Sequence, residues 1–130
     1  MSQSSESQLL ELTHQLLKSI GSKDWAKYVE LCDDSLTCFE PEARGHLVAG
    51  LDFHKYYFEL PGKSSNRQTT LTAPHVRMMG QDAAVVSYVR LVQHLDAAGQ
   101  AQTVEFEETR VWQKRDGSWK HVHFHRSQNT

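Results

Sequence analysis

Residues 102–126 read Gln102-Thr-Val-Glu-Phe-Glu-Glu-Thr-Arg-Val-Trp-Gln-Lys-Arg-Asp-Gly-Ser-Trp-Lys-His-Val-His-Phe-His-Arg126, and this stretch decides the fold. Valine, threonine and aromatic residues are frequent in its two segments, 102–115 and 118–126, as in β-strands. The dipeptide Asp116-Gly117 between them is strongly preferred in two-residue hairpin turns. The stretch therefore predicts two long antiparallel strands joined by a tight turn.

Two more segments of the same kind, 68–79 and 83–95, precede this hairpin and are separated by the turn signals at 80–82 and 96–99. Consecutive hairpins predict an antiparallel meander. Strands of about twelve residues are long, and because sheets twist we expect them to curl into a cone with a cavity at its open end.

The first half of the chain predicts helices. A leucine stripe indicates a long helix from about Gln8 to Ile20, with capping-box spacing at Ser5 and Gln8. A second helix would begin after Asp24, followed by a short strand over 36–39 and a third helix over 51–60. Helices first and a meander afterwards give an α+β fold, with the helices packed on one face of a strongly curved sheet.

Three arginines, Arg90, Arg110 and Arg126, lie on apolar even-numbered rows of three neighbouring strands. Side chains alternate faces along a strand, so the three arginines are predicted to share one face. A buried guanidinium needs a carboxylate or water. Either the arginines make internal ion pairs, or they line a hydrated pocket that binds an anion. The acids considered as partners are Glu108 on the row of Arg110, and Glu40, Glu42 and Asp52.

His121, His123 and His125 are spaced to lie on one strand face, which suits a metal site or a histidine-lined contact with a helix or subunit. We favour the contact, because no clearly placed further ligand is visible, and we expect no metal. It would weaken on acidification if the imidazoles are buried in the neutral form.

Acid–base catalysis is not expected from this sequence, and no residue is assigned a catalytic role. Glu107 and Glu108 are adjacent on a strand and point to opposite faces. Asp52 and His54 are two residues apart, which does not place them on one helix face. Fingerprints for a nucleophile elbow, a P-loop or a dinucleotide are absent from the sequence, and we expect no cofactor.

Composition excludes several classes of protein. The 130 residues carry a net charge of −2 with neutral histidines, which gives no general attraction for nucleic acid or anionic membranes. No apolar run is long enough to cross a bilayer, and the start does not resemble a signal peptide. Cys32 and Cys38 fit two reduced core thiols, so we expect a cytoplasmic protein.

Several motifs occur in a characteristic order: Phe39-Glu-Pro-Glu-Ala43, Gly50-Leu-Asp-Phe-His54, Tyr57-Phe-Glu59, Pro74-His-Val76, Glu107-Glu-Thr-Arg-Val-Trp112, Arg115-Asp-Gly117 and Val122-His-Phe-His-Arg-Ser127. Together they resemble the association (hub) domain of calcium/calmodulin-dependent protein kinase II, over residues 6–127. Residues 1–5 are then expected to be a disordered lead-in, and 128–130 a short tail.

The resemblance implies an NTF2-like cone whose copies assemble into a two-tiered ring of twelve or fourteen subunits. In the full-length kinase, which binds calmodulin, the hub gathers kinase domains; the domain itself is not catalytic. The family's cavity arginines match Arg90, Arg110 and Arg126, and His54 matches a cavity histidine. We expect a cavity that binds a small carboxylate or a peptide segment. The cavity residues assigned are Arg90, Arg110, Arg126, His54, Tyr57 and Glu108.

Two alternatives stay open at the level of sequence. The chain is either an excised kinase hub or a free-standing hub-like protein. NTF2-like cones also host small isomerases, dehydratases and cyclases, so an enzyme is the competing hypothesis. The loop 61–65 looks shorter than in animal hubs, which puts any ligand gate formed by this loop in doubt.

Overall fold

A computed structural model describes residues 4–61 and 67–128. Most of the loop 61–65, the residues 1–3 of the expected lead-in and the end of the expected tail lie outside the described residues. Residues 4 and 5, also expected in the lead-in, form the start of a helix.

Three helices precede the long strands. α1 spans Ser5–Gly21, α2 spans Trp25–Leu31 and α3 spans Asp52–Glu59. α1 begins three residues before the predicted start, because the hydroxyl of Ser4 accepts a hydrogen bond from the backbone N–H of Ser7 at 3.2 Å and caps the helix there. Asp24 caps α2 as expected, accepting from the backbone N–H of Lys27 at 3.1 Å.

The described residues form a sheet of six strands in the order β2-β1-β6-β5-β4-β3. Their bounds are β1 Cys32–Phe39, β2 Val48–Ala49, β3 Gln68–Met78, β4 Ala83–Leu95, β5 Ala101–Arg115 and β6 Ser118–Gln128. β3 to β6 form the predicted antiparallel meander. β1 pairs with β6 in parallel, so the sheet is mixed rather than purely antiparallel. This pairing joins residues about ninety positions apart, and no local sequence pattern predicts it.

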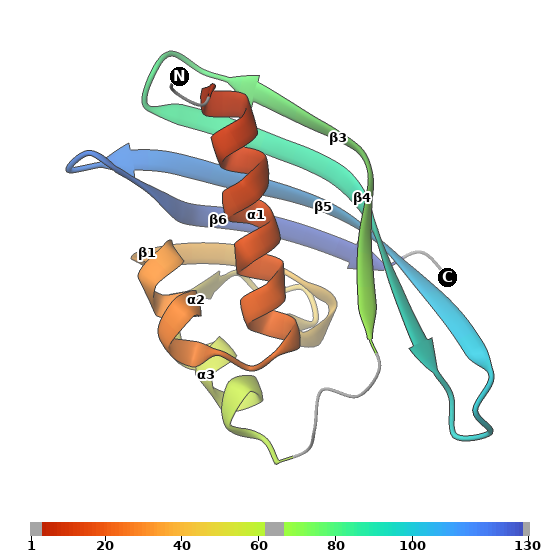
Figure 1. Ribbon diagram of the computed structural model, residues 1–130. Helices are drawn as coiled ribbons and strands as arrows, with labels where there is room; N and C mark the ends of the chain where they lie inside the picture. The colour runs from red at the N-terminus through yellow and green to blue at the C-terminus, as the bar shows by residue number, and fades with distance from the viewer. Residues whose placement is uncertain (1–3, 62–66, 129–130) are drawn as a thin grey trace.

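Irregularities in register accompany the curvature of the sheet. β3 shifts register against β4 between Thr72 and His75, where Ala73 has a φ of +48°. Bulges of this kind bend a strand and increase its twist. Figure 1 shows the long strands bending, with all three helices lying against one side of the sheet. The other side, which we call the outer face, carries none of the described helices.

A bulge in β6 corrects one prediction. β5 pairs Val111 with His123 and Trp112 with His121, which leaves Val122 as an extra residue. The three histidines therefore do not share a face. His121 is fully buried in the core, while His123 is half-buried and His125 is exposed.

The same bulge divides the predicted even row of β6. Phe124 is buried and Arg126 lies at the cavity, as predicted, but Lys120 reaches away from the cavity to the carbonyl of Glu30.

The core lies between the helices and the inner face of the sheet. Leu9 and Leu16 of α1 are fully buried and belong to the same cluster as Val86 and Trp112 of the sheet. Burial of each large apolar side chain contributes about 1.5–3 kcal/mol. Both cysteines are free and buried, as predicted. None of the described helices is long and apolar enough to cross a membrane.

Candidate anion-binding cavity

A cavity of about 330 Å³ opens between α3 and the inner face of the sheet. Its charged and polar lining comes from β4, β5 and β6, from the segment that follows β1, from the residue before β3 and from α3. Those residues are Glu40, Glu42, His54, Tyr57, Arg67, Arg90, Arg110 and Arg126. Apolar walls are supplied by Ile20, Phe58 and Phe124, with Tyr28 beside them. A concave apolar site with a few converging charges is the usual form of a ligand pocket.

Glu108 forms ion pairs with two of the arginines, Arg90 and Arg110, behind the cavity wall. We call these three residues and Tyr88 the Glu108 cluster. Arg110 donates to the Glu108 carboxylate at 3.1 Å and to the Tyr88 hydroxyl at 2.8 Å. Arg90 donates to the other carboxylate oxygen at 3.1 Å, and the Tyr88 hydroxyl donates to Glu108 at 2.6 Å. Only 2% of Glu108 and 1% of Arg110 are exposed. All four side chains of the cluster are buried, and Arg90 and Tyr88 are the most exposed of them.

Charge pairing outweighs burial at Glu108, whereas burial outweighs charge pairing at Arg90. Burial alone would raise the pKa of the Glu108 carboxyl, but the positive charges of Arg110 and Arg90 lower it below its usual value. Burial lowers the pKa of Arg90 below its usual value, because the attraction of Glu108 only partly offsets the loss of hydration and the positive charge of Arg110 opposes it. The Nε atom of Arg90 is buried and has no hydrogen-bond partner among the described residues. Arg90 therefore retains an unused donor next to the cavity.

Arg126 forms a second group with Glu40, Glu42 and His54, which we call the Arg126 cluster. Its guanidinium contacts both Glu40, at 3.4 Å, and Glu42. The other oxygen of Glu40 lies 2.8 Å from Nε2 of His54. Burial raises the pKa of the Glu40 carboxyl, but the hydrogen bond and charge of His54, followed by Arg126, lower it overall. The side chain of Glu42 is 37% exposed, so this cluster is partly open to solvent.

Both interpretations of the three arginines describe part of the structure. The arginines make internal ion pairs, and all three also line the cavity. The pairs involve Glu108, Glu40 and Glu42, whereas Asp52 is exposed on α3 and pairs with none of the three.

Of the six assigned cavity residues, five line the cavity and Glu108 lies behind it. The sequence interpretation did not find Tyr28, Phe124 or Arg67 as lining residues. It also missed the contact of Cys38 with His54, where the sulfur lies 3.7 Å from Nε2. Glu107 is exposed and Glu108 buried, in agreement with the predicted strand alternation.

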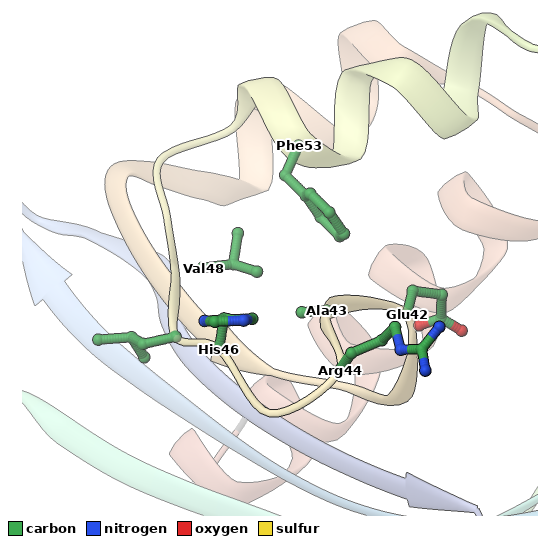
Figure 2. Close-up of a pocket in the computed structure, with 7 residues that line it drawn as sticks. Glu42, Ala43, Arg44, His46, Val48 and Phe53 are labelled. Carbon is green, nitrogen blue, oxygen red and sulfur yellow. The ribbon is translucent and has the colours of Figure 1, made fainter.

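A second, more open groove of about 570 Å³ lies at the side of the 3-10 helix η1, Pro41–Ala43. Figure 2 shows Phe53 of α3 on one side of this groove and Ala43, Arg44 and His46 on the other. Glu42 borders both the groove and the cavity. The groove lacks the buried ion pairs of the cavity, so we take the cavity as the candidate site.

Comparison with known proteins identifies the family of this chain. A family model described as the calcium/calmodulin dependent protein kinase II association domain matches residues 5–130. The delta subunit of this kinase from Oryctolagus cuniculus is 48% identical over 122 residues, and the alpha chain from Drosophila melanogaster is 51% identical over 122 residues. Each match covers 92% of this chain but only 23% of the relative, so the chain spans about a quarter of the length of these relatives.

Solved structures show the same similarity. A CaMKII hub homology domain from Chlamydomonas reinhardtii is 49% identical with a TM-score of 0.93, covering 98% of this chain and all of that one. The association domain of CaMKII from C. elegans is 45% identical with a TM-score of 0.90, covering 94% of each chain. A putative ketosteroid isomerase from Shewanella frigidimarina, 18% identical with a TM-score of 0.71, covers 90% of this chain and 92% of that one and shares the fold alone.

Proposed function

The chain belongs to the calcium/calmodulin dependent protein kinase II association domain family, and on that premise we propose that it is an oligomerisation module whose copies close into a two-tiered ring of twelve or fourteen subunits. In a full-length protein of this kind the ring holds kinase subunits close together in the cytoplasm. The domain supplies the assembly and no catalysis.

One structural observation carries this proposal: the apolar patch on the outer face of the sheet. Val85, Val89, Leu91 and Val111 occupy the odd-numbered rows of β4 and β5 and are only partly exposed. Val85 and Val111 lie directly opposite each other, so the patch crosses both strands there, whereas Val89 and Leu91 lie opposite the exposed acids Glu107 and Glu105. None of the helices in the described part of the chain covers it (Figure 1). An uncovered apolar sheet face of this kind fits burial against a second copy.

Placing a charge in the patch tests the proposed contact. We expect Val89→Lys to shift the mass measured by light scattering from a large assembly to one or two subunits, because a lysine buried in an apolar contact loses its hydration. Gln100→Lys, at the exposed turn after β4, adds the same charge away from the patch and should leave the mass unchanged. A Val89→Lys protein with the wild-type mass would rule out this face as a subunit contact.

A second proposed role is binding of a small carboxylate, or of a carboxylate on a peptide segment, in the cavity. The supporting observation is the set of arginine donors at one end of the cavity: the unpaired Nε of Arg90 and the solvent-accessible guanidinium of Arg126. Guanidinium groups match carboxylates in a bidentate manner. Arg67 adds a further positive charge at the rim.

Binding would require an exchange of carboxylates. Arg90, Arg110 and Arg126 already face the acids Glu108, Glu40 and Glu42. Glu42 is the most exposed of these acids and also borders the groove beside the 3-10 helix η1. It is therefore the acid that a ligand displaces at lowest cost, leaving Arg126 to the incoming carboxylate.

Removing Arg126 tests this role. We expect a saturating monocarboxylate such as butyrate to raise the thermal midpoint, since binding to the folded state at 100 times Kd adds about 2.7 kcal/mol. Arg126→Gln should abolish the increase, whereas Arg77→Gln, which removes an exposed arginine of β3, should retain it. Sodium chloride at equal ionic strength controls for screening. An unchanged increase in Arg126→Gln would place the ligand elsewhere.

The enzyme hypothesis has less support in the geometry of the cavity. Cys38 and Glu40 both approach the same atom of His54, Nε2. A nucleophile–histidine–acid relay instead needs the nucleophile on one ring nitrogen and the acid on the other. Substrate turnover that disappears in His54→Ala would favour the enzyme hypothesis over the assembly module.

A further inference from the structure

Three side chains with different metal-binding atoms converge at the wall of the cavity. Cys38 lies on β1, Glu40 directly follows that strand, and His54 lies on α3. The thiol sulfur, a carboxylate oxygen and a ring nitrogen all lie within 4.8 Å of one another, and all three side chains are buried. None of the functions discussed above uses the thiol.

The contacts of His54 cannot all be satisfied by hydrogen bonds. Nε2 lies 2.8 Å from Oε1 of Glu40 and 3.7 Å from Sγ of Cys38. A ring nitrogen has one proton or one lone pair in the ring plane, so it serves only one of these neighbours at a time. When Nε2 donates to Glu40, the Cys38 thiol has no acceptor there. A cation at the common centre would satisfy all three atoms together.

We propose that Cys38, Glu40 and His54 form a binding site for a divalent cation of the zinc type. Sulfur, nitrogen and carboxylate oxygen are the ligands that zinc takes in proteins. With usual zinc bond lengths in a tetrahedron, a Cys–His pair has its ligand atoms ~3.6 Å apart, close to the 3.7 Å found here. The Glu40 oxygen has to retreat from Nε2 by about 0.6 Å, which replaces the hydrogen bond with coordination.

The surrounding charges have opposing effects on this site. Arg126 holds the second oxygen of Glu40 and so orients the carboxylate, as outer-shell partners of metal ligands do. The positive charges of Arg110 and Arg126 repel a cation but favour the Cys38 thiolate that coordinates it. Burial raises the pKa of the Cys38 thiol to about 12 despite them, so binding releases a proton. We therefore expect an affinity that falls as the pH falls.

The fourth coordination position opens toward the cavity. Glu40 and His54 both line the cavity, whereas Cys38 lies behind them. Exchange of the thiol proton for a dication adds one positive charge to the cavity wall. Water or a small anion in the cavity would complete the tetrahedron, which is the arrangement of an open zinc site.

Cys32 provides a matched control within the same strand. Its sulfur lies 3.5 Å from Nδ1 of His121, and both residues are buried in the core. Among the described residues, no carboxylate lies close enough to Cys32 and His121 to act as a third metal ligand, as Glu40 does for Cys38 and His54. Of the two buried Cys–His contacts among the described residues, the one beside the cavity has a third ligand.

Cobalt(II) titration of the purified assembled protein, with the thiols kept reduced, tests the proposal. Cobalt replaces zinc in such sites, and a bound thiolate gives a sulfur-to-cobalt charge-transfer band in the near ultraviolet. We expect one equivalent of this band per chain, removed by zinc. It should be lost in Cys38→Ala and kept in Cys32→Ala. The sulfur band separates the site from surface sites among the eight histidines, which bind cobalt without it.

Two results would overturn the proposal: no sulfur band in the wild type, or a band that persists in Cys38→Ala. Glu40→Gln is the second variant, because it keeps the thiol and the side-chain volume while removing the charged ligand. We expect it to weaken cobalt binding at least tenfold. Unchanged cobalt affinity in Glu40→Gln would exclude the carboxylate as a ligand.

Discussion

The Glu108 cluster and the Arg126 cluster both pair guanidinium groups with carboxylates, but in different environments. In the first, Glu108 is buried and bonded to Arg90, Arg110 and Tyr88. In the second, the guanidinium of Arg126 is held by two acids, one of which is 37% exposed. A buried ion pair is costly to break, whereas a solvent-exposed pair contributes little and exchanges readily. The Glu108 cluster therefore belongs to the fold, and the Arg126 cluster is the part suited to ligand exchange.

Neutralising the buried acid should have the largest effect on stability. Glu108→Gln leaves Arg90 and Arg110 without their shared carboxylate, and we expect a loss of about 3–5 kcal/mol in unfolding free energy. Glu107→Gln removes the same charge from the exposed neighbour on the opposite face and should change little. Urea unfolding of both variants at equal protein concentration measures the difference. Similar stabilities for the two variants would contradict the structural role of the cluster.

Acid should destabilise the core next to the Glu108 cluster through His121. Burial, followed by the charge of Arg110, lowers the pKa of this histidine well below 6.5, so it stays neutral when folded. The unfolded chain takes up a proton as the pH falls through 6.5 and the folded chain does not. Stability from this residue is therefore lost below pH 6.5, by about 1.4 kcal/mol per pH unit until the folded pKa is reached.

Replacing His121 separates this effect from those of the other histidines. His121→Gln should flatten the decline in unfolding free energy between pH 6.5 and pH 5. His123→Gln, at a half-buried position on the outer face, should flatten it less. Unfolding curves at several pH values give the slopes. Equal slopes in wild type and His121→Gln would show that another group is responsible.

Neutralising Glu42, the most exposed of the acids that pair with the cavity arginines, should have the smallest effect. We expect it to change ligand binding rather than stability. Glu42→Gln replaces the carboxylate that competes for Arg126 with a neutral amide. An exposed ion pair contributes up to about 1 kcal/mol, so we expect carboxylate affinity to rise about two- to five-fold. Calorimetric titration with butyrate compares wild type and variant. Weaker binding in Glu42→Gln would mean that Glu42 helps to hold the ligand instead of competing with it.

Local pattern predicted more of the fold than of the site. Strand alternation placed Arg90 and Arg110 on the inner face, because β4 and β5 pair without interruption. Strand alternation failed at His121. The extra residue Val122 reverses the alternation of side chains along β6, so that His121 points to the inner face, and this bulge has no sequence signature of its own. The partners of Arg126 come from the end of β1, which reaches β6 only through a parallel pairing distant in sequence.

The contact between Cys38 and His54 was beyond local reasoning for a similar reason. The two residues are sixteen positions apart, and the segment between them contains the 3-10 helix η1 and the strand β2. Cys38 was correctly predicted as a buried thiol, but its neighbours depend on how α3 packs against β1.

The mass of the purified chain in solution at micromolar concentration tests the central claim, assembly, most directly. Native mass spectrometry alongside light scattering should give twelve or fourteen times the subunit mass of 14.9 kDa. A species with the mass of one or two subunits under these conditions would contradict the proposed ring.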